Sequence, residues 1–363
     1  MNAILVAKNS TNQLIYLHPR ISREELAGLR EREQFFCPGC GGSLLLKIGT
    51  IKIPHFSHKT HSECATFSEP ESLAHLHGKS MLHTFFSQNH HHVELEKYFP
   101  QIRQRADLLI DQKFAVEFQC SPIPTNQIQA RSAGYISAGV KPLWLLSAKA
   151  PLTEGIQLIK LKAFEQALIG KGNSCSFLLA FDPSANNFHY YSSLFFISGY
   201  HWIAKTKSLA AEKQVFPFAQ PRKLTIAEFS QVTELAYAAR KRFVRSQQFV
   251  QNRFRKRFWR LCYELRLDAN SLPLTMGIPL IKNHLLADNP VLWQLQAVLA
   301  DSNGFSMNQL LSLGQVKLTA EATEQEALAH LEQYMEIHRL MKKQETNEAL
   351  LLELLYDNYC KNV

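Results

Sequence analysis

One short segment in the first third of this 363-residue chain constrains the fold more than any other. Residues 106–110 and 114–118 are rich in apolar, β-forming side chains, and polar residues 111–113 separate them. Side chains alternate between the two faces of a strand, so Glu117 and Gln119 share one face while their apolar neighbours point into a core. The pattern predicts a β-hairpin at the surface of an otherwise buried sheet.

The predicted hairpin carries one carboxylate on each strand, Asp107 on the first and Glu117 on the second. Mg²⁺ prefers oxygen ligands, keeps several waters and often completes its shell with phosphate oxygens of a substrate. A metal held by this pair would activate a water and neutralise charge on a phosphodiester. The alternative is that both acids are ordinary solvent-facing residues at strand ends.

A helix is expected before the hairpin. Ser68-Glu69-Pro70-Glu71 has the form of a helix N-terminus, with a capping serine and an early proline, and the helical pattern extends to about residue 88. Glu71, His75 and Lys79 are spaced four residues apart, so they form one polar stripe along this helix. That stripe is able to face the hairpin.

The elements after the helix complete a defined order. A strand is expected at residues 93–98, then the hairpin, a helix at residues 125–138 and a buried strand at residues 141–147. The predicted order is αβββαβ. With acids on the first helix and on the second and third strands, this order resembles the core of the PD-(D/E)XK nuclease superfamily. The resemblance implies an α/β, restriction-endonuclease-like fold.

Six groups of residues carry a narrower resemblance. They are Cys37-Pro-Gly-Cys40, Pro54-His55-Phe-Ser-His58 followed by Cys64, Glu71-x3-His75-x3-Lys79, Arg105-Ala-Asp107, Glu117-Phe-Gln119-Cys-Ser121 and Arg131-x3-Tyr135. In these residues the chain is similar to the competence protein CoiA family, over about residues 1–150. This resemblance implies a nuclease that acts on DNA in uptake, processing and recombination during natural transformation, with recombination proteins as partners.

The resemblance also implies roles for single residues. Asp107 and Glu117 would bind Mg²⁺ or Mn²⁺, and Glu71 would add a third carboxylate. Gln119 stands where the superfamily usually has lysine, and its amide can orient a water or a phosphate but carries no charge. Lys79 is placed to supply that charge from the helix. Two alternatives stay open: Glu71 only caps its own helix, and Lys79 only extends to solvent.

Four further polar residues are candidates for auxiliary roles in the site. Arg131 and Tyr135 lie one turn apart on the second predicted helix, with Gln127 one turn earlier. This stripe either grips phosphates or bases, or is an ordinary solvated or interface face. His75 either hydrogen-bonds a metal-bound water or a phosphate, or pairs with a neighbouring carboxylate such as Glu71.

Upstream of these elements, cysteines and histidines have the spacing of a zinc site. Cys37 and Cys40 lie in a Pro-Gly-Cys-Gly-Gly turn that lets two thiolates converge, and His55, His58 and Cys64 follow. Structural Zn²⁺ takes four N or S ligands, so one histidine is surplus. His58 is favoured, because the apolar run before His55 places that residue on a strand. A redox dithiol is the alternative, disfavoured because no βαβ pattern precedes the cysteine pair.

The remaining four cysteines are scattered along the sequence, so no disulfide framework is implied. The first residues do not have the pattern expected of a secretory leader, and no apolar run is long enough for a membrane span. These features favour a reducing, cytoplasmic location.

Charge distinguishes the C-terminal region. The formal net charge is +9, and residues 220–268 hold twelve basic and four acidic residues. Aromatic residues are interspersed with the basic ones, so this segment is expected to bind nucleic-acid phosphates with little sequence preference. The alternative is a helix that buries its aromatics and exposes its arginines to solvent. The candidate contacts are Arg240, Lys241, Arg245, Arg253 and Arg257.

Three units are expected from these patterns. They are a β-rich zinc-binding module at residues 1–66 with strands at 3–7, 14–17 and 44–48; a nuclease-like domain at 67–215 with a further helix near 154–168 and strands at 176–181 and 187–197; and a helical region at 216–363. The predicted protein is a cytoplasmic, metal-dependent DNA nuclease. The rival is a nuclease-fold protein that holds DNA for recombination without cutting it, favoured by Gln119. An RNA-directed enzyme is a weaker third reading.

Overall fold

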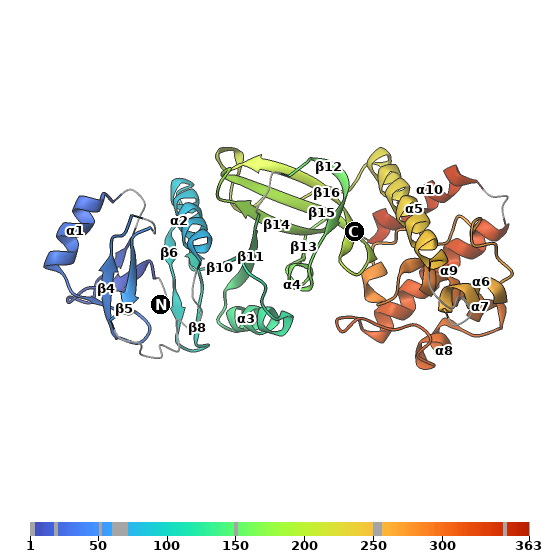
Figure 1. Ribbon diagram of the computed structural model, residues 1–363, viewed down its shortest axis with the longest axis horizontal. Helices are drawn as coiled ribbons and strands as arrows, with labels where there is room; N and C mark the ends of the chain where they lie inside the picture. The colour runs from blue at the N-terminus through green and yellow to red at the C-terminus, as the bar shows by residue number, and fades with distance from the viewer. Residues whose placement is uncertain are drawn as a thin grey trace.

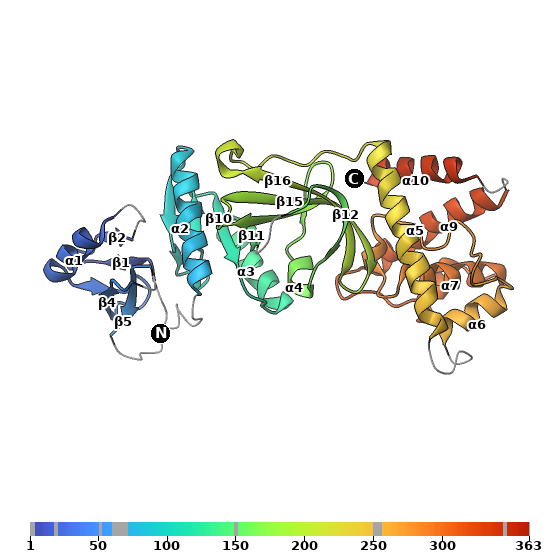
Figure 2. The same cartoon turned by 45° about the horizontal axis from the view of Figure 1, so that its top comes forward.

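The structure is a computed structural model that describes residues 4–17, 21–50, 53–59, 72–148, 152–249, 256–343 and 347–362. The chain is extended along one axis in the order of its sequence (Figures 1 and 2). A small β-rich module (blue) precedes a central sheet with flanking helices (cyan to green) and a helical region (yellow to red). The predicted fold class, α/β with a β-rich N-terminal module and a helical C-terminal region, is confirmed.

The N-terminal module is an antiparallel sheet in the order β2-β1-β3-β4-β5, with one helix. The predicted first hairpin is present, because Val6 pairs with Tyr16 and the side chain of Asn9 accepts N–H bonds from Thr11 and Gln13 in the turn. The elements are β1 (Val6–Lys8), β2 (Leu14–Tyr16), α1 (Arg23–Arg32), β3 (Phe35–Phe36), β4 (Ser43–Lys47) and β5 (His55–His58).

The predicted αβββαβ order is present in the central region. Strands β6, β9 and β10 are antiparallel neighbours, and β11 lies parallel to β10. A small hairpin, β7 with β8, lies between β6 and β9 in the sequence. The elements are α2 (Leu73–Gln88), β6 (Val93–Leu95), β7 (Tyr98–Phe99), β8 (Gln104–Arg105), β9 (Leu108–Ile110), β10 (Phe114–Gln119), α3 (Thr125–Ser137) and β11 (Lys141–Ser147).

The first helix of this core begins later than predicted. Ser72 is its N-cap, and the Ser72 hydroxyl accepts the N–H of His75. The expected start at Ser68 is therefore wrong, because Ser72 is an equally good capping residue and stands directly before the apolar face that packs. Glu71 lies outside the described residues.

The helix packs on the sheet through a glycine. A Cβ built on Gly78 of α2 would lie 2.0 Å from the ring of Phe118 in β10, so only glycine allows this close approach. The approach brings the neighbouring residues of α2 against β9 and β10. Helix α3 covers the opposite face, because Glu117, which alternates with Phe118, contacts α3.

The sheet continues beyond β11 in the order β11-β14-β15-β16-β12, and the predicted strands at 176–181 and 187–197 are present. The predicted helix near 154–168 is wrong. Residues 155–160 form β12, which pairs with β16 along its whole length, because Gly155 has φ of +112° and strand pairing overrides the helical pattern. The elements are β12 (Gly155–Lys160), α4 (Ala163–Gln166), β13 (Gly170–Lys171), β14 (Ser176–Asp182), β15 (Asn187–Ser198) and β16 (His201–Ala210).

The described part of the C-terminal region is helical, as predicted. Its first helix begins with a capping box, in which Thr225 and Glu228 bond each other's backbone N–H. Within the described ranges, none of the helices combines the length and the apolar character that crossing a membrane requires. The helices are α5 (Ile226–Gln248), α6 (Arg257–Glu264), α7 (Pro290–Ser302), α8 (Met307–Ser312), α9 (Glu324–Lys343) and α10 (Glu348–Asn362).

Candidate functional site

The two predicted carboxylates lie together at one end of the β9–β10 pairing. The ladder ends with Leu108 opposite Val116, and Asp107 and Glu117 are the next residue on each strand. The N–H of Phe118 donates to Asp107 Oδ2 over 2.8 Å, which fixes the first acid against the backbone beside the second. Both acids are buried. Their burial excludes the alternative of ordinary solvent-facing residues.

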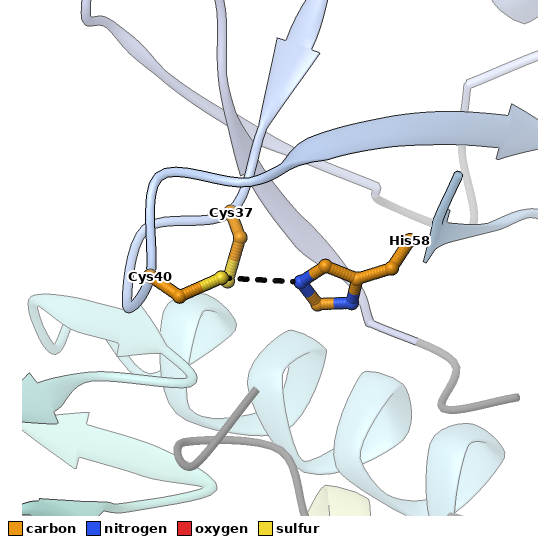
Figure 3. A group of neighbouring side chains, drawn as sticks. All are labelled: Cys37, Cys40 and His58. Atoms are coloured by element: carbon orange, nitrogen blue, oxygen red, sulfur yellow. Dashed lines mark hydrogen bonds between the residues drawn. The ribbon is translucent and has the colours of Figure 1, made fainter. Parts of the chain in front are cut away.

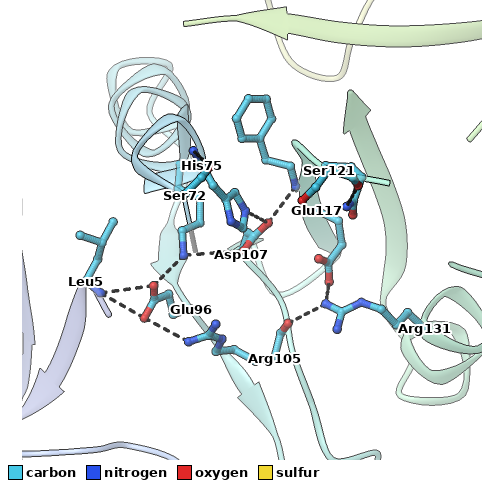
Figure 4. A network of polar contacts seen from close by, with 12 residues as sticks. Leu5, Ser72, His75, Glu96, Arg105, Asp107, Glu117, Ser121 and Arg131 are labelled. Carbon is cyan, nitrogen blue, oxygen red and sulfur yellow. Dashed lines mark hydrogen bonds and ion pairs between the residues drawn. The ribbon is translucent and has the colours of Figure 1, made fainter. Parts of the chain in front are cut away.

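Asp107 is surrounded by donors from α2 (Figure 4). Nε2 of His75 lies 3.0 Å from Asp107 Oδ2, and Nζ of Lys79 lies 3.8 Å from Oδ1. Burial by itself raises the pKa of Asp107, but His75, Lys79 and the N–H of Phe118 outweigh it, so this pKa lies well below its usual range. His75, Lys79 and the N–H of Phe118 therefore favour the ionised form of Asp107.

Glu117 has its partners on α3. The guanidinium of Arg131 and the hydroxyl of Tyr135 both donate to Glu117 Oε1, and Arg131 also donates to the carbonyl of Arg105 over 3.0 Å. Burial, with a contribution from the negative charge of Asp107, raises the pKa of Glu117 above its ordinary value, although Arg131 and Tyr135 oppose the rise. The two acids are thus pushed in opposite directions, a pattern that clusters at functional sites.

Lys79 is fully buried, with 0% of its surface exposed, so the alternative of a lysine that extends to solvent is wrong. Its Nζ donates to Oε1 of Glu96 over 2.7 Å, and the carboxylate of Glu96 in turn pairs with Arg105 at 3.5 Å. Sequence reasoning missed Glu96. Glu96 follows the apolar Leu95 in a short predicted strand, as a solvent-facing acid would. No signal in the sequence therefore distinguishes it from such an acid.

The other predicted side chains are placed as follows. The amide of Gln119 donates to the carbonyl of Ser121 over 2.5 Å and makes no hydrogen bond to Asp107 or Glu117. Tyr135 is fully buried, which excludes a solvated face for this residue. Its hydroxyl donates to Glu117 because α3 packs on that side of the sheet. His75 pairs with Asp107, one of the two alternatives predicted for it.

The acid pair retains oxygens suited to a divalent metal. Within the part of the chain that the structure describes, the hydrogen bonds of Glu117 go to Oε1 and those of Asp107 go to Oδ2. Oε2 of Glu117 and Oδ1 of Asp107 are the oxygens that would coordinate, and Lys79 Nζ lies 3.8 Å from this Oδ1, beyond hydrogen-bond distance. Two carboxylate oxygens plus waters and substrate phosphate match the ligands that Mg²⁺ takes in proteins. The donor set therefore fits Mg²⁺ or Mn²⁺.

A second candidate metal centre lies in the N-terminal module (Figure 3). Cys37, Cys40 and His58 converge, with their ligand atoms all within 4.8 Å of one another, and Cys40 Sγ lies 3.3 Å from His58 Nε2. Two ligand atoms that each lie about 2.3 Å from a tetrahedral Zn²⁺ are ~3.8 Å from each other. The separations within this group of three residues therefore fit Zn²⁺. Nδ1 of His55 lies 2.9 Å from the carbonyl oxygen of Ile53, and His55 is not in this group. Cys64, the fourth expected ligand, lies outside the described residues.

Replacing one thiolate should remove the metal. In Cys40→Ser we expect the protein to lose one equivalent of zinc. Its affinity for zinc should fall by more than ~10–100-fold, which is the cost of losing a hydrogen bond that only orients a metal ligand. The measurement is metal content by mass spectrometry after exhaustive dialysis. Cys360→Ser on α10 is the matched control and should keep its zinc; equal zinc in both variants would refute the site.

The basic C-terminal residues divide into two groups. Arg240 is a structural residue, because its guanidinium donates to the carbonyls of Leu272, Pro273 and Met276. Arg257 likewise pairs with Asp288 and donates to the carbonyl of Gln315. Arg240 contacts residues 272–276 and Arg257 contacts Asp288, both in the segment that precedes α7, and Arg257 also reaches Gln315 after α8.

Two of the other basic candidates lie at the surface. Lys241 and Arg245 are exposed on α5. Arg253 lies outside the described residues. The exposed pair is therefore the better candidate for phosphate contacts.

The order of elements and the paired carboxylates define a nuclease-like α/β domain, preceded by a module with a cysteine–histidine cluster. Residues 71–257, more than half of the chain, match the family model "Competence protein CoiA, nuclease-like domain", and residues 19–67 match "Competence protein CoiA, N-terminal domain". The chain belongs to the competence protein CoiA family. Competence protein CoiA of Bacillus subtilis (strain 168) is 40% identical over 119 residues, which span 32% of this chain and 32% of that relative. No solved structure gives a significant match.

Proposed function

We propose that this protein is a metal-dependent nuclease that hydrolyses DNA phosphodiesters. The observation that carries the proposal is the pair Asp107 and Glu117, buried side by side with their pKa values shifted in opposite directions and a buried lysine 3.8 Å from Asp107. Mg²⁺ or Mn²⁺ would be held by Asp107 and Glu117, with Glu71 as a further carboxylate. The bound metal supplies an activated water and neutralises charge on the phosphate.

The residues around the pair have separable tasks in this proposal. Asp107, held as a carboxylate by its neighbours, provides a ligand that protons do not displace. Lys79 provides the positive charge that Gln119 lacks, and Gln119 would orient the water or the phosphate. Arg131 opposes the rise in the pKa of Glu117 and fixes the orientation of its carboxyl group. Preorganised charge of this kind, in a site shielded from water, is the largest source of rate enhancement in many enzymes.

The cellular role follows from the family. The relative from Bacillus subtilis carries the name competence protein, so we place the activity in DNA processing and recombination during natural transformation, in the cytoplasm. Recombination proteins that act on the same DNA would be its partners. The N-terminal cluster would hold structural Zn²⁺.

The exposed basic residues of α5 should add affinity for DNA. Replacing Lys241 and Arg245 together by alanine is expected to weaken binding at low salt and to reduce the slope of log K against log salt by about 2, because each phosphate contact contributes about 0.9. Fluorescence anisotropy with a labelled oligonucleotide across a salt series measures both. The Arg30→Ala, Arg32→Ala pair on α1 is the control, and equal slopes in both double variants would contradict the assignment.

The proposed activity is tested by cleavage of linear and circular, single- and double-stranded DNA in Mg²⁺, Mn²⁺ or EDTA. We expect product only with metal, and none from Glu117→Gln, which cannot ionise. Asp111→Asn, which alters an acid in the hairpin turn, should cut as the wild type does. Wild-type protein that forms no metal-dependent product on any substrate would refute the nuclease.

A second candidate function is DNA binding without cleavage. It is favoured by Gln119, which stands where lysine is usual and whose amide is bonded to Ser121. A binding module should still shift DNA in a gel while leaving it intact, and Glu117→Gln should bind as tightly as the wild type. The same set of reactions therefore separates the two functions.

A further inference from the structure

Glu96 occupies the centre of a charge network that joins two parts of the fold (Figure 4). It follows β6 and is 5% exposed. Its carboxylate accepts from Nζ of Lys79 over 2.7 Å and lies 3.5 Å from Arg105. A buried carboxylate is costly unless it is paired and hydrogen-bonded, and Glu96 meets both conditions.

The backbone of Glu96 is also unusual. Its φ is +53°, in the left-handed region that glutamate rarely adopts, and its N–H donates to the carbonyl of Asp107 over 2.8 Å. Such a conformation persists only where the surroundings over-determine it, and it clusters at functional sites. The backbone of Glu96 is therefore fixed to Asp107, while its side chain is fixed to Lys79.

The N-terminal module supplies the remaining donor. The N–H of Leu5 lies 3.3 Å from each carboxylate oxygen of Glu96, across 91 residues of sequence. This contact lies beside a cleft of about 590 Å³ between the two parts, lined by Leu5 and Leu26 on one side and by Ser80 and Met81 on the other. Leu5 belongs to the apolar core that joins the N-terminal module to the central region and also lines this cleft, so its polar contact with Glu96 lies where the two parts meet.

We infer that Glu96 is the positioning residue that holds Lys79 beside Asp107, and that the main chain of the N-terminal module holds Glu96 in turn. The role of Lys79 in catalysis rests on the proposed nuclease function. The claim that Glu96 fixes the position of Lys79 does not depend on that function. The N-terminal module is, on this account, a structural part of the nuclease-like site. A separate nuclease-like domain would lack the donor from Leu5.

Two substitutions of Glu96 and one control test the inference in the full-length protein. Glu96→Gln keeps the shape and removes the charge, and Glu96→Asp keeps the charge on a shorter side chain. Glu94→Gln is the matched control, because Glu94 lies on β6 two residues before Glu96 and pairs with Lys97, which is 38% exposed, rather than with Lys79. Thermal unfolding checks that each variant is folded.

Three readouts are compared in these variants: kcat and KM for metal-dependent cleavage, hydrogen exchange at the amide of Leu5, and the rate at which an amine reagent modifies Lys79. For Glu96→Gln we expect kcat to fall about 10–100-fold with KM unchanged, since small displacements at a reacting centre cost about this much. The rate of hydrogen exchange at the amide of Leu5 and the rate of Lys79 modification should both rise at least about tenfold, because each group loses its charge-assisted hydrogen bond to Glu96. Glu96→Asp should recover part of kcat, and Glu94→Gln should match the wild type.

The outcomes distinguish a failure of this inference from a failure of the proposed nuclease function. Wild-type protein that cuts no DNA refutes the nuclease, and Leu5 exchange and Lys79 modification then decide the positioning role alone. Glu96→Gln with wild-type exchange and modification rates overturns the inference, whatever its activity. If Glu96→Gln does not fold, Glu96→Asp decides: partial kcat with faster Lys79 modification supports the inference, and wild-type values of both overturn it.

Discussion

Lys79→Met should destabilise the protein by about 3–5 kcal/mol and abolish metal-dependent cleavage. Lys79 is fully buried between Glu96 and Asp107, and methionine fills its space without its charge. Removing one partner of a buried ion pair leaves an uncompensated buried charge, which accounts for the size of the loss. Urea denaturation measures the loss in the free energy of unfolding, and product formation in Mg²⁺ measures the loss of cleavage.

Two further variants show whether the loss arises from the buried charge. Lys97→Met removes a lysine that is 38% exposed and pairs with Glu94 at the surface, so its cost should be within ~1 kcal/mol. Adding Glu96→Gln to Lys79→Met removes the orphaned anion and should restore part of the stability. A Lys79→Met protein as stable as Lys97→Met would show that the buried network contributes little.

Arg131→Met should shift the pH dependence of cleavage upward and lower the rate at pH 7 by at least about tenfold. Burial already raises the pKa of Glu117, and Arg131 is the positive charge that limits the rise. Without that charge the protonated form is favoured further, so Glu117 ionises at a higher pH. Since a metal binds the carboxylate and not the acid, activity should appear only at the more alkaline end of the profile.

The measurement is the pH–rate profile of Arg131→Met at saturating metal. Arg131→Lys keeps a charge near Glu117 but not the fork that also bonds the carbonyl of Arg105, so its profile should fall between those of Arg131→Met and the wild type. If Arg131→Met has the profile of the wild type at reduced amplitude, Arg131 does not act through the ionisation of Glu117.

Local pattern was enough to predict much of the central fold. The strand at 141–147 and the helix at 125–138 were located within a residue or two, because each has a continuous apolar or periodic signal. The hairpin, and with it the adjacency of Asp107 and Glu117, followed from two β-prone runs, the polar turn between them and strand alternation. These features depend on residues close in sequence.

Features set by distant contacts could not be predicted in this way. Glu96 has the sequence surroundings of a solvent-facing acid and is buried only because α2 and the N-terminal module meet over it. Tyr135 fits a surface stripe on its helix, yet packing against the sheet buries it. Residues 154–168 have a helical pattern, but pairing with β16 makes most of the first half a strand. In each case tertiary packing overrides a local signal.

The most direct test of the central claim is single-turnover cleavage by wild-type protein and by Asp107→Asn, with DNA retention measured in the same reactions in Mg²⁺ and in EDTA. The account predicts that the wild type cuts only with metal, and that Asp107→Asn loses at least about a thousandfold in rate while it still retains the DNA. Cleavage by Asp107→Asn at the wild-type rate would contradict the assignment of this acid pair as the catalytic metal site.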